Sequence, residues 1–144
     1  MNISLSQLNY RLKTKPLLVG GRAMEFYHLR KSGADIDFIV TAEDYAGLAE
    51  IYPDKLKNLA GDLGVGVFGF ELWKTICSFG YKFLAQGAFE KSDYKVISLE
   101  KLLFLKSLGI AKPKFAADVR LLVQKIFDIR YHKDKDYSSD YFDR

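Results

Sequence analysis

The stretch Leu17–Val40, LLVGGRAMEFYHLRKSGADIDFIV, places two aspartates, Asp35 and Asp37, inside an apolar run that is typical of a buried strand. A buried carboxylate costs free energy unless it is paired, hydrogen-bonded or bound to a cation. Because side chains alternate along a strand, the two aspartates share one face, whereas Ile36 and Phe38 point into the core. The pattern predicts a strand that carries a divalent metal site. The alternative is an edge strand with one wet face.

The first half of this stretch predicts a strand, a glycine turn and a helix. Gly20 and Gly21 lie between the apolar run and the helix, and Arg22 follows them. Glycines allow close approach of the backbone to a ligand, and a helix N-terminus favours negative charge. We therefore expect a phosphate-binding turn, with a simple turn as the alternative. No Gly-Lys-Ser/Thr follows, so this is not a Walker A loop.

A third carboxylate has the same surroundings as Asp37. In VFGFELW, Glu71 lies between two apolar residues. If its strand lies beside that of Asp35 and Asp37, three hard oxygen ligands converge, which suits Mg²⁺ and a phosphoryl displacement. Asp62 in AGDLG is the alternative third acid, although its glycines favour a turn. Glu71 is otherwise a polar residue on a half-exposed strand.

The bulk composition is that of a soluble globular protein. The chain has 144 residues, of which 49% are hydrophobic, 15% aromatic and 28% charged, with a formal net charge of +4. No apolar run approaches the roughly 20 residues that span a bilayer. The N-terminal residues lack the order of a signal peptide, and the single cysteine, Cys77, fits a reducing compartment. We expect a cytoplasmic protein without a membrane partner.

Hydrophobic periodicity and turn residues predict an α/β (α+β) domain with a small mixed sheet flanked by helices. Thr41 is a good N-cap, with Asp44 three residues later. We expect one domain over residues 1–130 and a polar, flexible tail over 131–144. The expected helices are 4–13, 22–31, 42–52, 99–110 and 115–131, with a helical turn or two and a loop over 54–64. The expected strands are 17–19, 34–40, one or two within 65–77, and 95–97.

Taken together, three sequence elements resemble the signature of the polymerase-β-like nucleotidyltransferase superfamily. Val19–Gly21 matches its hydrophobic residue followed by Gly-Gly or Gly-Ser. Asp35–Phe38 matches the acid–hydrophobic–acid–hydrophobic strand about a dozen residues later, and Phe70–Leu72 matches the third acid. The resemblance covers residues 15 to 75. The C-terminal segments SLEKLLFLK and PKFAADVRLL are similar to the helical tail of small bacterial members.

The resemblance implies a nucleotidyltransferase fold and transfer of a nucleoside monophosphate from an NTP, such as ATP, to an acceptor hydroxyl. Asp35 and Asp37 then hold Mg²⁺ or Mn²⁺, and Glu71 completes the site or acts as base. The implied phosphate-binding residues are Gly20, Gly21, Arg22 and Lys106. The acceptor stays open between an RNA end, a small molecule and a protein. Small members of this kind imply a toxin–antitoxin or defence role, with a cognate antitoxin or other partner protein.

Two other function classes stay open. Many members of the superfamily carry Arg-x-Thr before the acidic strand, whereas this chain has KSGAD with Ser32 and Gly33; Arg30 or Lys31 are the substitutes. The change favours a catalytically inactive nucleotidyltransferase-like binding or regulatory module. The net charge of +4 is compatible with a nucleic-acid-binding domain, which predicts salt-sensitive binding that ignores Mg²⁺.

Overall fold

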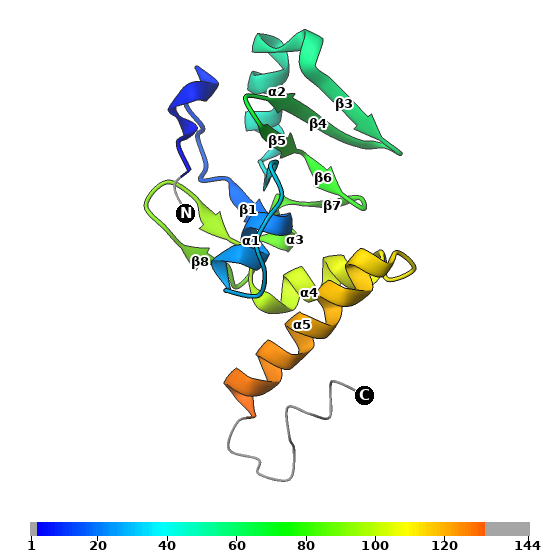
Figure 1. The fold of residues 1–144 in the computed structure, drawn as a ribbon. Coiled ribbons are helices and arrows are strands. Elements are labelled where there is room, and N and C mark those ends of the chain that lie inside the picture. Colours follow the sequence, from blue (N-terminus) through cyan, green and yellow to red (C-terminus); the bar gives the residue numbers. More distant parts are fainter. Residues whose placement is uncertain (1–2, 132–144) are drawn as a thin grey trace. The chain divides into compact units, whose positions relative to one another are not determined.

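A computed structural model of the protein describes residues 3–131. The described residues form two compact units, residues 3–98 and residues 99–131 (Figure 1). The prediction of one domain over residues 1–130 stays a prediction, because nothing fixes the arrangement of the two units. The predicted flexible tail lies outside the described residues, apart from Tyr131.

The first unit contains a mixed sheet of seven strands, which confirms the mixed α and β class. The strand order is β3-β4-β5-β2-β1-β9-β8. Strand β2 pairs in parallel with β5, and β1 pairs in parallel with β9, whereas the other pairs are antiparallel. The strands are β1 Leu17–Val19, β2 Ile36–Ile39, β3 Leu56–Leu59, β4 Asp62–Val67, β5 Phe70–Trp73, β8 Phe89–Glu90 and β9 Lys95–Val96.

Strands β1 and β2 are joined through the helix α1, Gly20–Phe26. The three residues of β1 are buried, as an apolar run predicts for a central strand. The helix ends at Phe26, five residues before the predicted end, because His28 has a φ of 60° in the left-handed region. Tyr27 also donates a hydrogen bond from its hydroxyl to the carbonyl of Ile97, at 2.6 Å. The residues that follow form the loop to β2.

The predicted cap of the helix α2, Ala42–Ile51, is confirmed. The Thr41 hydroxyl accepts a hydrogen bond from the Asp44 backbone N–H at 3.1 Å. The predicted helix 4–13 is wrong in length: only the 3-10 helix η1, Leu5–Leu8, forms, and Asn9 ends it with a φ of 50°. The chain that follows is irregular, and the backbone N–H groups of Lys13 and Thr14 donate to Asp44.

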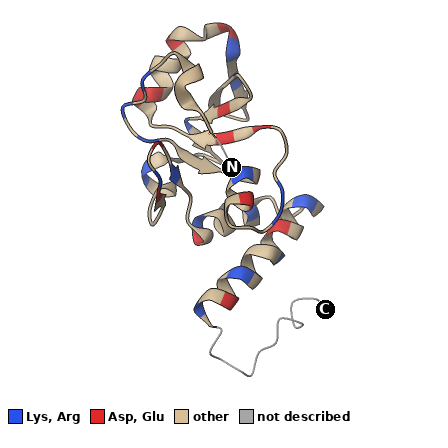
Figure 2. Ribbon diagram, turned by 60° about the vertical axis from the view of Figure 1, so that its left-hand side comes forward, with Lys and Arg blue, Asp and Glu red and all other residues tan. Residues whose placement is uncertain are grey.

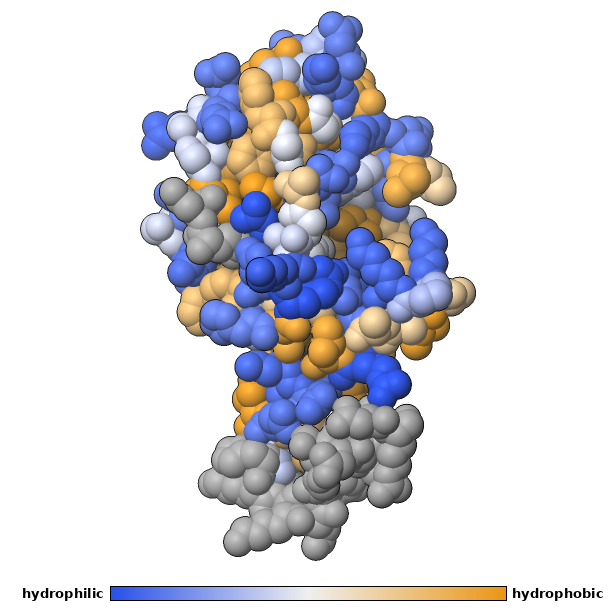
Figure 3. All heavy atoms as spheres, in the orientation of Figure 1, coloured by the Kyte–Doolittle hydropathy of each residue, from blue (hydrophilic) through white to orange (hydrophobic). Residues whose placement is uncertain are grey.

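A β-hairpin replaces the helical turns predicted after residue 54. The 3-10 helix η2, Pro53–Lys55, is followed directly by β3 and β4. Ala60 and Gly61 connect the strands with φ of 52° and 97°, as a two-residue hairpin turn requires. Strand β3 is an edge strand, and Leu56 and Leu59 are 49% and 67% exposed. Figure 3 shows apolar residues at the surface in its upper part, where Figure 1 places α2 and β3.

The remaining elements of the first unit are short. Strands β6, Thr75–Ile76, and β7, Phe79–Gly80, form a separate two-stranded sheet, and the helix α3, Tyr81–Leu84, follows. The predicted strand at 95–97 is confirmed as β9. The core of this unit is apolar, and its fully buried side chains include Leu8, Leu17, Leu18, Met24, Phe38, Ile39, Leu48, Leu72, Leu84 and Ile97.

The second unit consists of two helices that pack on each other, α4 Leu99–Leu108 and α5 Pro113–Arg130. Both were predicted. Gly109 follows the last residue of α4. A Cβ at this position would lie 2.5 Å from the Phe115 ring, so the connection between α4 and α5 requires glycine. Within residues 3–131, no helix is long and apolar enough to cross a membrane.

Candidate functional site

The structure brings Asp37 and Glu71 together on neighbouring parallel strands. Asp37 of β2 lies in register with Glu71 of β5, and Glu71 lies in register with Gly66 of β4. Because cross-strand partners share a face, both carboxylates project from the same side of the sheet. They lie close enough that each shifts the pKa of the other through a shared hydrogen bond. The predicted pairing of the second and third acids is therefore present in the fold.

The two carboxylates have different proton affinities. Burial, a hydrogen bond with Glu71 and the negative charges of Glu71 and Asp35 raise the pKa of Asp37 to about 7, although the Trp73 indole N–H, which donates to it, opposes this. Burial would also raise the pKa of Glu71, but hydrogen bonds from Lys57 and Asp37 outweigh it and hold that pKa below its usual value. Near neutral pH, Asp37 is thus poised to hold a proton that it donates to Glu71.

Asp35 lies at the side of this pair. It is exposed and precedes β2, which begins at Ile36. Its charge raises the pKa of both Asp37 and Lys57, so it lies near enough to act on them. Among residues 3–131, no group of three or more His, Cys, Asp or Glu side chains is arranged to hold a metal ion. The structure therefore brings two of the three predicted acids into contact.

The sequence analysis missed Lys57, whose ammonium forms an ion pair with Glu71. Lys57 lies on β3 and its stem passes over Gly66 of β4, where a Cβ would lie 2.7 Å from the Lys57 Cε. The signal that indicates this arrangement is the alternation of Gly64 and Gly66, which leaves one face of β4 bare. The helical turns expected after residue 54 leave no strand beside these glycines, and so no place for Lys57 next to Glu71.

Gly64, the other glycine on this face of β4, leaves room for the Trp73 ring. A Cβ at Gly64 would lie 2.5 Å from the Trp73 ring, and the two residues are cross-strand partners. The indole therefore lies flat against β4 and is positioned to donate to Asp37. Packing of this kind holds the Asp37 carboxylate in one orientation.

Gly20 lies next to the Asp37 carboxylate, where there is no room for a side chain. Its φ is +65°, and a Cβ would lie 2.7 Å from the Asp37 Oδ2. The strand–helix turn and the acidic strand thus touch at this point. Gly21 differs, because its Cβ would make ordinary contacts at 3.5 Å with the Arg30 guanidinium and the Ser32 side chain.

Arg22 has an unsatisfied donor in the first turn of α1. Its Nε is a buried side-chain nitrogen without a hydrogen-bond partner in the described part of the chain. Buried polar groups are nearly always paired, so this guanidinium N–H is a candidate donor to an anionic ligand. Arg30, one of the predicted substitutes for the missing Arg-x-Thr, lies beside this turn, next to Gly21.

Asp62, the alternative third acid, has a structural role. Its carboxylate accepts hydrogen bonds from the Thr75 hydroxyl at 2.7 Å and from the backbone N–H groups of Cys77 at 2.7 Å and Ser78 at 2.9 Å. Cys77 and Ser78 both have positive φ, so these bonds fix the turn between β6 and β7. Burial would raise the pKa of Asp62, but these bonds lower it.

Lys106, the predicted phosphate ligand from the C-terminal helices, belongs to the second unit. Its ammonium is 2.9 Å from the Asp118 carboxylate, and both side chains are nearly buried. It also lies over the Phe115 ring, 4.9 Å from the centroid. Within this unit Lys106 joins α4 to α5, and its predicted contact with phosphate stays a prediction.

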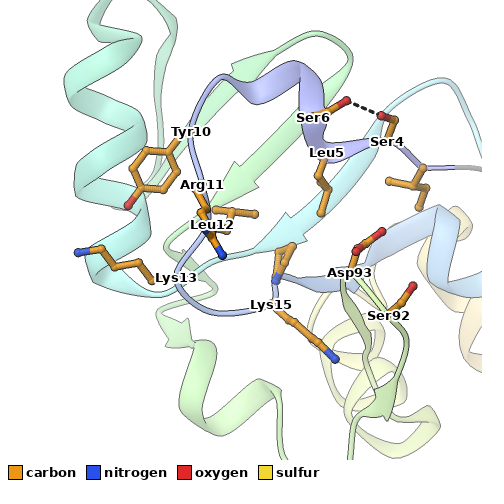
Figure 4. A pocket seen from close by; sticks show the side chains of 12 residues that line it. Ser4, Leu5, Ser6, Tyr10, Arg11, Leu12, Lys13, Lys15, Ser92 and Asp93 are labelled. Carbon is orange, nitrogen blue, oxygen red and sulfur yellow. Dashed lines mark hydrogen bonds between the residues drawn. The ribbon is translucent and has the colours of Figure 1, made fainter.

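A cavity of about 700 Å³ lies at the other end of β1 from the acids (Figure 4). Pro16 lines it before β1 begins, whereas Val19, at the end of β1, is in register with Asp37. Its basic side chains include Lys13 and Lys15, which pair with Glu43 and Glu90. The lining residues are Ile3, Ser4, Leu5, Ser6, Tyr10, Arg11, Leu12, Lys13, Lys15, Pro16, Ser92 and Asp93. The acid pair does not line this cavity.

Charges of both signs are interspersed over the first unit (Figure 2). This pattern differs from the one-sided basic stripe of a dedicated polynucleotide-binding face. Comparison of the chain with protein-family models, with curated proteins and with solved structures finds no match. Any functional conclusion therefore depends on the geometry of the site and on the resemblance of its sequence elements.

Proposed function

We propose that the protein is a metal-dependent nucleotidyltransferase that moves a nucleoside monophosphate from an NTP to an acceptor hydroxyl. The observation that carries the proposal is the contact of Gly20 with the Asp37–Glu71 pair. It joins a turn suited to phosphate with a carboxylate pair suited to a cation, and Mg²⁺ bound to a triphosphate needs both.

The residues present fit a magnesium ion. Mg²⁺ in proteins is held by one or two carboxylates, with waters and substrate phosphates in its other positions, so a group of three protein ligands is not required. The burial and negative charge that raise the pKa of Asp37 are the conditions that a divalent cation relieves. Binding requires Asp37 to release its proton, because a carboxylate ligates a metal ion in its ionised form.

The division of labour in the proposed reaction follows from the positions of the residues. Asp37 and Glu71 would hold the ion, which would neutralise charge on the phosphate oxygens, and Asp35 is the third candidate oxygen ligand. The backbone of Gly20 and Gly21, together with Arg22, orients the triphosphate. Catalysis of this type depends on positioning and charge neutralisation, without a covalent enzyme intermediate.

The acceptor stays open between an RNA end, a small molecule and a protein side chain. The resemblance to small bacterial nucleotidyltransferases extends the proposal to a toxin–antitoxin or defence role, with a cognate antitoxin as partner. Lys106 remains a candidate phosphate ligand within this proposal.

A second candidate function is a catalytically silent, nucleotidyltransferase-like binding module. The ion pair of Lys57 with Glu71 favours it, because an ammonium already satisfies one of the two carboxylates. A module of this kind binds an NTP with metal and does not transfer it, or it binds neither.

Thermal melting tests both candidates. The wild type, Asp37→Asn and the matched control Asp54→Asn, which removes an exposed acid, are melted with each NTP in the presence and absence of Mg²⁺. A nucleotidyltransferase shows a rise in Tm that needs metal and NTP together, is lost in Asp37→Asn and is kept in Asp54→Asn. Labelled NTP with candidate acceptors then separates transfer from silent binding. No rise under any condition contradicts the proposed function.

A further inference from the structure

The position of the Lys57 ammonium depends on what else binds the acid pair, Asp37 and Glu71. Its ammonium contacts Glu71, yet 44% of its side chain and 24% of the Glu71 side chain are exposed. An ion pair this accessible to solvent is weak, because water screens it and holding a long side chain costs entropy. The contact therefore keeps Glu71 neutralised without closing it to other cations.

The path of the lysine stem depends on the bare face of β4. Lys57 is on β3 and Glu71 is on β5, so the side chain must cross the intervening strand. Gly66 is in register with Glu71 and lies directly beneath the stem, since its Cβ would meet the Lys57 Cε at 2.7 Å. Any larger residue at this position would push the stem away. The edge strand thus supplies a cation to a site two strands away.

A divalent ion and the Lys57 ammonium compete for the same Glu71 carboxylate. A metal ion that takes Glu71 leaves the ammonium without its partner, although the stem still directs it toward the site. Because Mg²⁺ shares its coordination with substrate phosphates, an ammonium within reach of Glu71 is also within reach of a metal-bound triphosphate. Ammonium groups are well suited to this second role, as point charges that bind phosphate.

We propose that Lys57 is the resident counter-ion of the acid pair, that a divalent cation displaces it from Glu71, and that it then binds the triphosphate of the nucleotide. This inference rests on the proposed function. It assigns Lys57 two successive partners, Glu71 and the triphosphate. Removal of the Lys57 charge therefore strengthens binding of the metal ion and weakens binding of the nucleotide. A residue with a purely structural role would change both affinities in one direction or neither.

The test compares Lys57→Met with Lys55→Met by calorimetric titration. Methionine keeps an unbranched stem over Gly66, and Lys55 is an exposed lysine in η2 whose replacement changes the net charge equally. Without nucleotide, we expect Lys57→Met to bind Mn²⁺ about fivefold more tightly than Lys55→Met, the upper end for an exposed pair. At saturating Mg²⁺, we expect it to bind a non-hydrolysable NTP analogue about fivefold more weakly.

The outcomes separate this inference from the proposed function. If the wild type binds Mn²⁺ and Lys57→Met binds it no more tightly than Lys55→Met, the displacement is wrong and the proposed function stands. If Mn²⁺ binds only to Lys57→Met, the lysine is not displaced, and the silent module is favoured. If no protein binds Mn²⁺, both proposals fail. Lys57→Gln, with its melting curve, repeats the test should Lys57→Met not fold.

Discussion

Two aspartates of the first unit, the buried Asp44 and the half-buried Asp37, have opposite surroundings. Asp44 is fully buried, and protein donors surround it: the Tyr10 hydroxyl at 3.0 Å and the backbone N–H groups of Lys13 and Thr14 at 3.0 to 3.1 Å. Asp37 has Glu71 and Asp35 as neighbours, with the Trp73 indole as a donor. One carboxylate is satisfied by the fold, whereas the other lies among like charges. This difference distinguishes a structural acid from a candidate ligand.

The largest effect on the free energy of unfolding is expected from replacing Asp44, whose carboxylate is satisfied by protein donors. Asp44→Ala leaves the backbone N–H groups of Lys13 and Thr14 without their acceptor and frees the N-terminal segment. We expect a loss of about 3 kcal/mol or more in the free energy of unfolding, as when a buried hydrogen-bonded network is broken. Urea unfolding measures it. A loss no larger than that of Asp54→Asn would mean that Asp44 does not hold this segment.

The next effect distinguishes the two glycines beside Asp37. Gly20→Ala places a Cβ at a φ of +65° and 2.7 Å from the Asp37 Oδ2, whereas Gly21→Ala meets ordinary contacts. We expect Gly20→Ala to destabilise the protein by about 2 kcal/mol and Gly21→Ala by less than about 0.5 kcal/mol. Thermal and urea unfolding of both variants check this. Equal losses would contradict the close packing of Gly20 on the acid pair.

A third prediction uses the raised pKa of Asp37. Because its pKa rises to about 7 on folding, the stabilisation from its proton is complete below about pH 4 and is lost as the pH rises through 7. Asp37→Asn carries no such proton. We expect this variant to be more stable than the metal-free wild type at pH 8 by about 1 to 2 kcal/mol.

Urea unfolding in EDTA from pH 4 to pH 8 measures this difference, with Asp54→Asn as the control. The advantage of Asp37→Asn should shrink toward pH 4. A variant that is less stable than the wild type at pH 8 would show that Asp37 is a structural hydrogen-bond acceptor like Asp44.

The smallest effect concerns the side chain of Lys13, whose backbone N–H serves Asp44. Its ammonium pairs with Glu43 at 2.7 Å, but both side chains are more than half exposed. We expect Lys13→Met to leave the urea midpoint unchanged, because exposed ion pairs contribute little. A clear loss would mean that side-chain pairing, beside the backbone contacts, holds the N-terminal segment to α2.

Local signals explain which parts of this fold were predictable. The buried run of β1, the apolar–acid alternation of β2, the Thr41 cap and the long α5 each carry their information within a few residues. The contact of Asp37 with Glu71 followed from placing two similar strands side by side. The glycine surroundings of Asp62 indicated a turn, and its carboxylate does bind the backbone of the turn between β6 and β7, whereas its rank behind Glu71 as a metal ligand stays a prediction.

The parts that were missed depend on contacts between distant residues. The segment DKLKNLAGDLG is rich in helix formers, yet it forms β3 and β4 because Ala60 and Gly61 turn the chain and β5 pairs with β4. The ion pair of Lys57 with Glu71 depends on this hairpin, because β3 carries Lys57 to the edge of the sheet beside β4. Asp35 falls outside β2 because the strand begins one residue later, a boundary that alternation cannot locate.

The unequal space at Gly20 and Gly21 gives a steric meaning to the superfamily signature that this stretch of sequence resembles. That signature admits Gly-Gly or Gly-Ser, which is glycine alone at the first position and a small side chain at the second. Here the first position has no room for a Cβ beside the Asp37 carboxylate, and the second has ordinary clearance. Glycine at position 20 is thus required twice, by its own φ of +65° and by an aspartate 17 residues later, so a smaller residue at position 37 would not by itself admit a side chain at position 20.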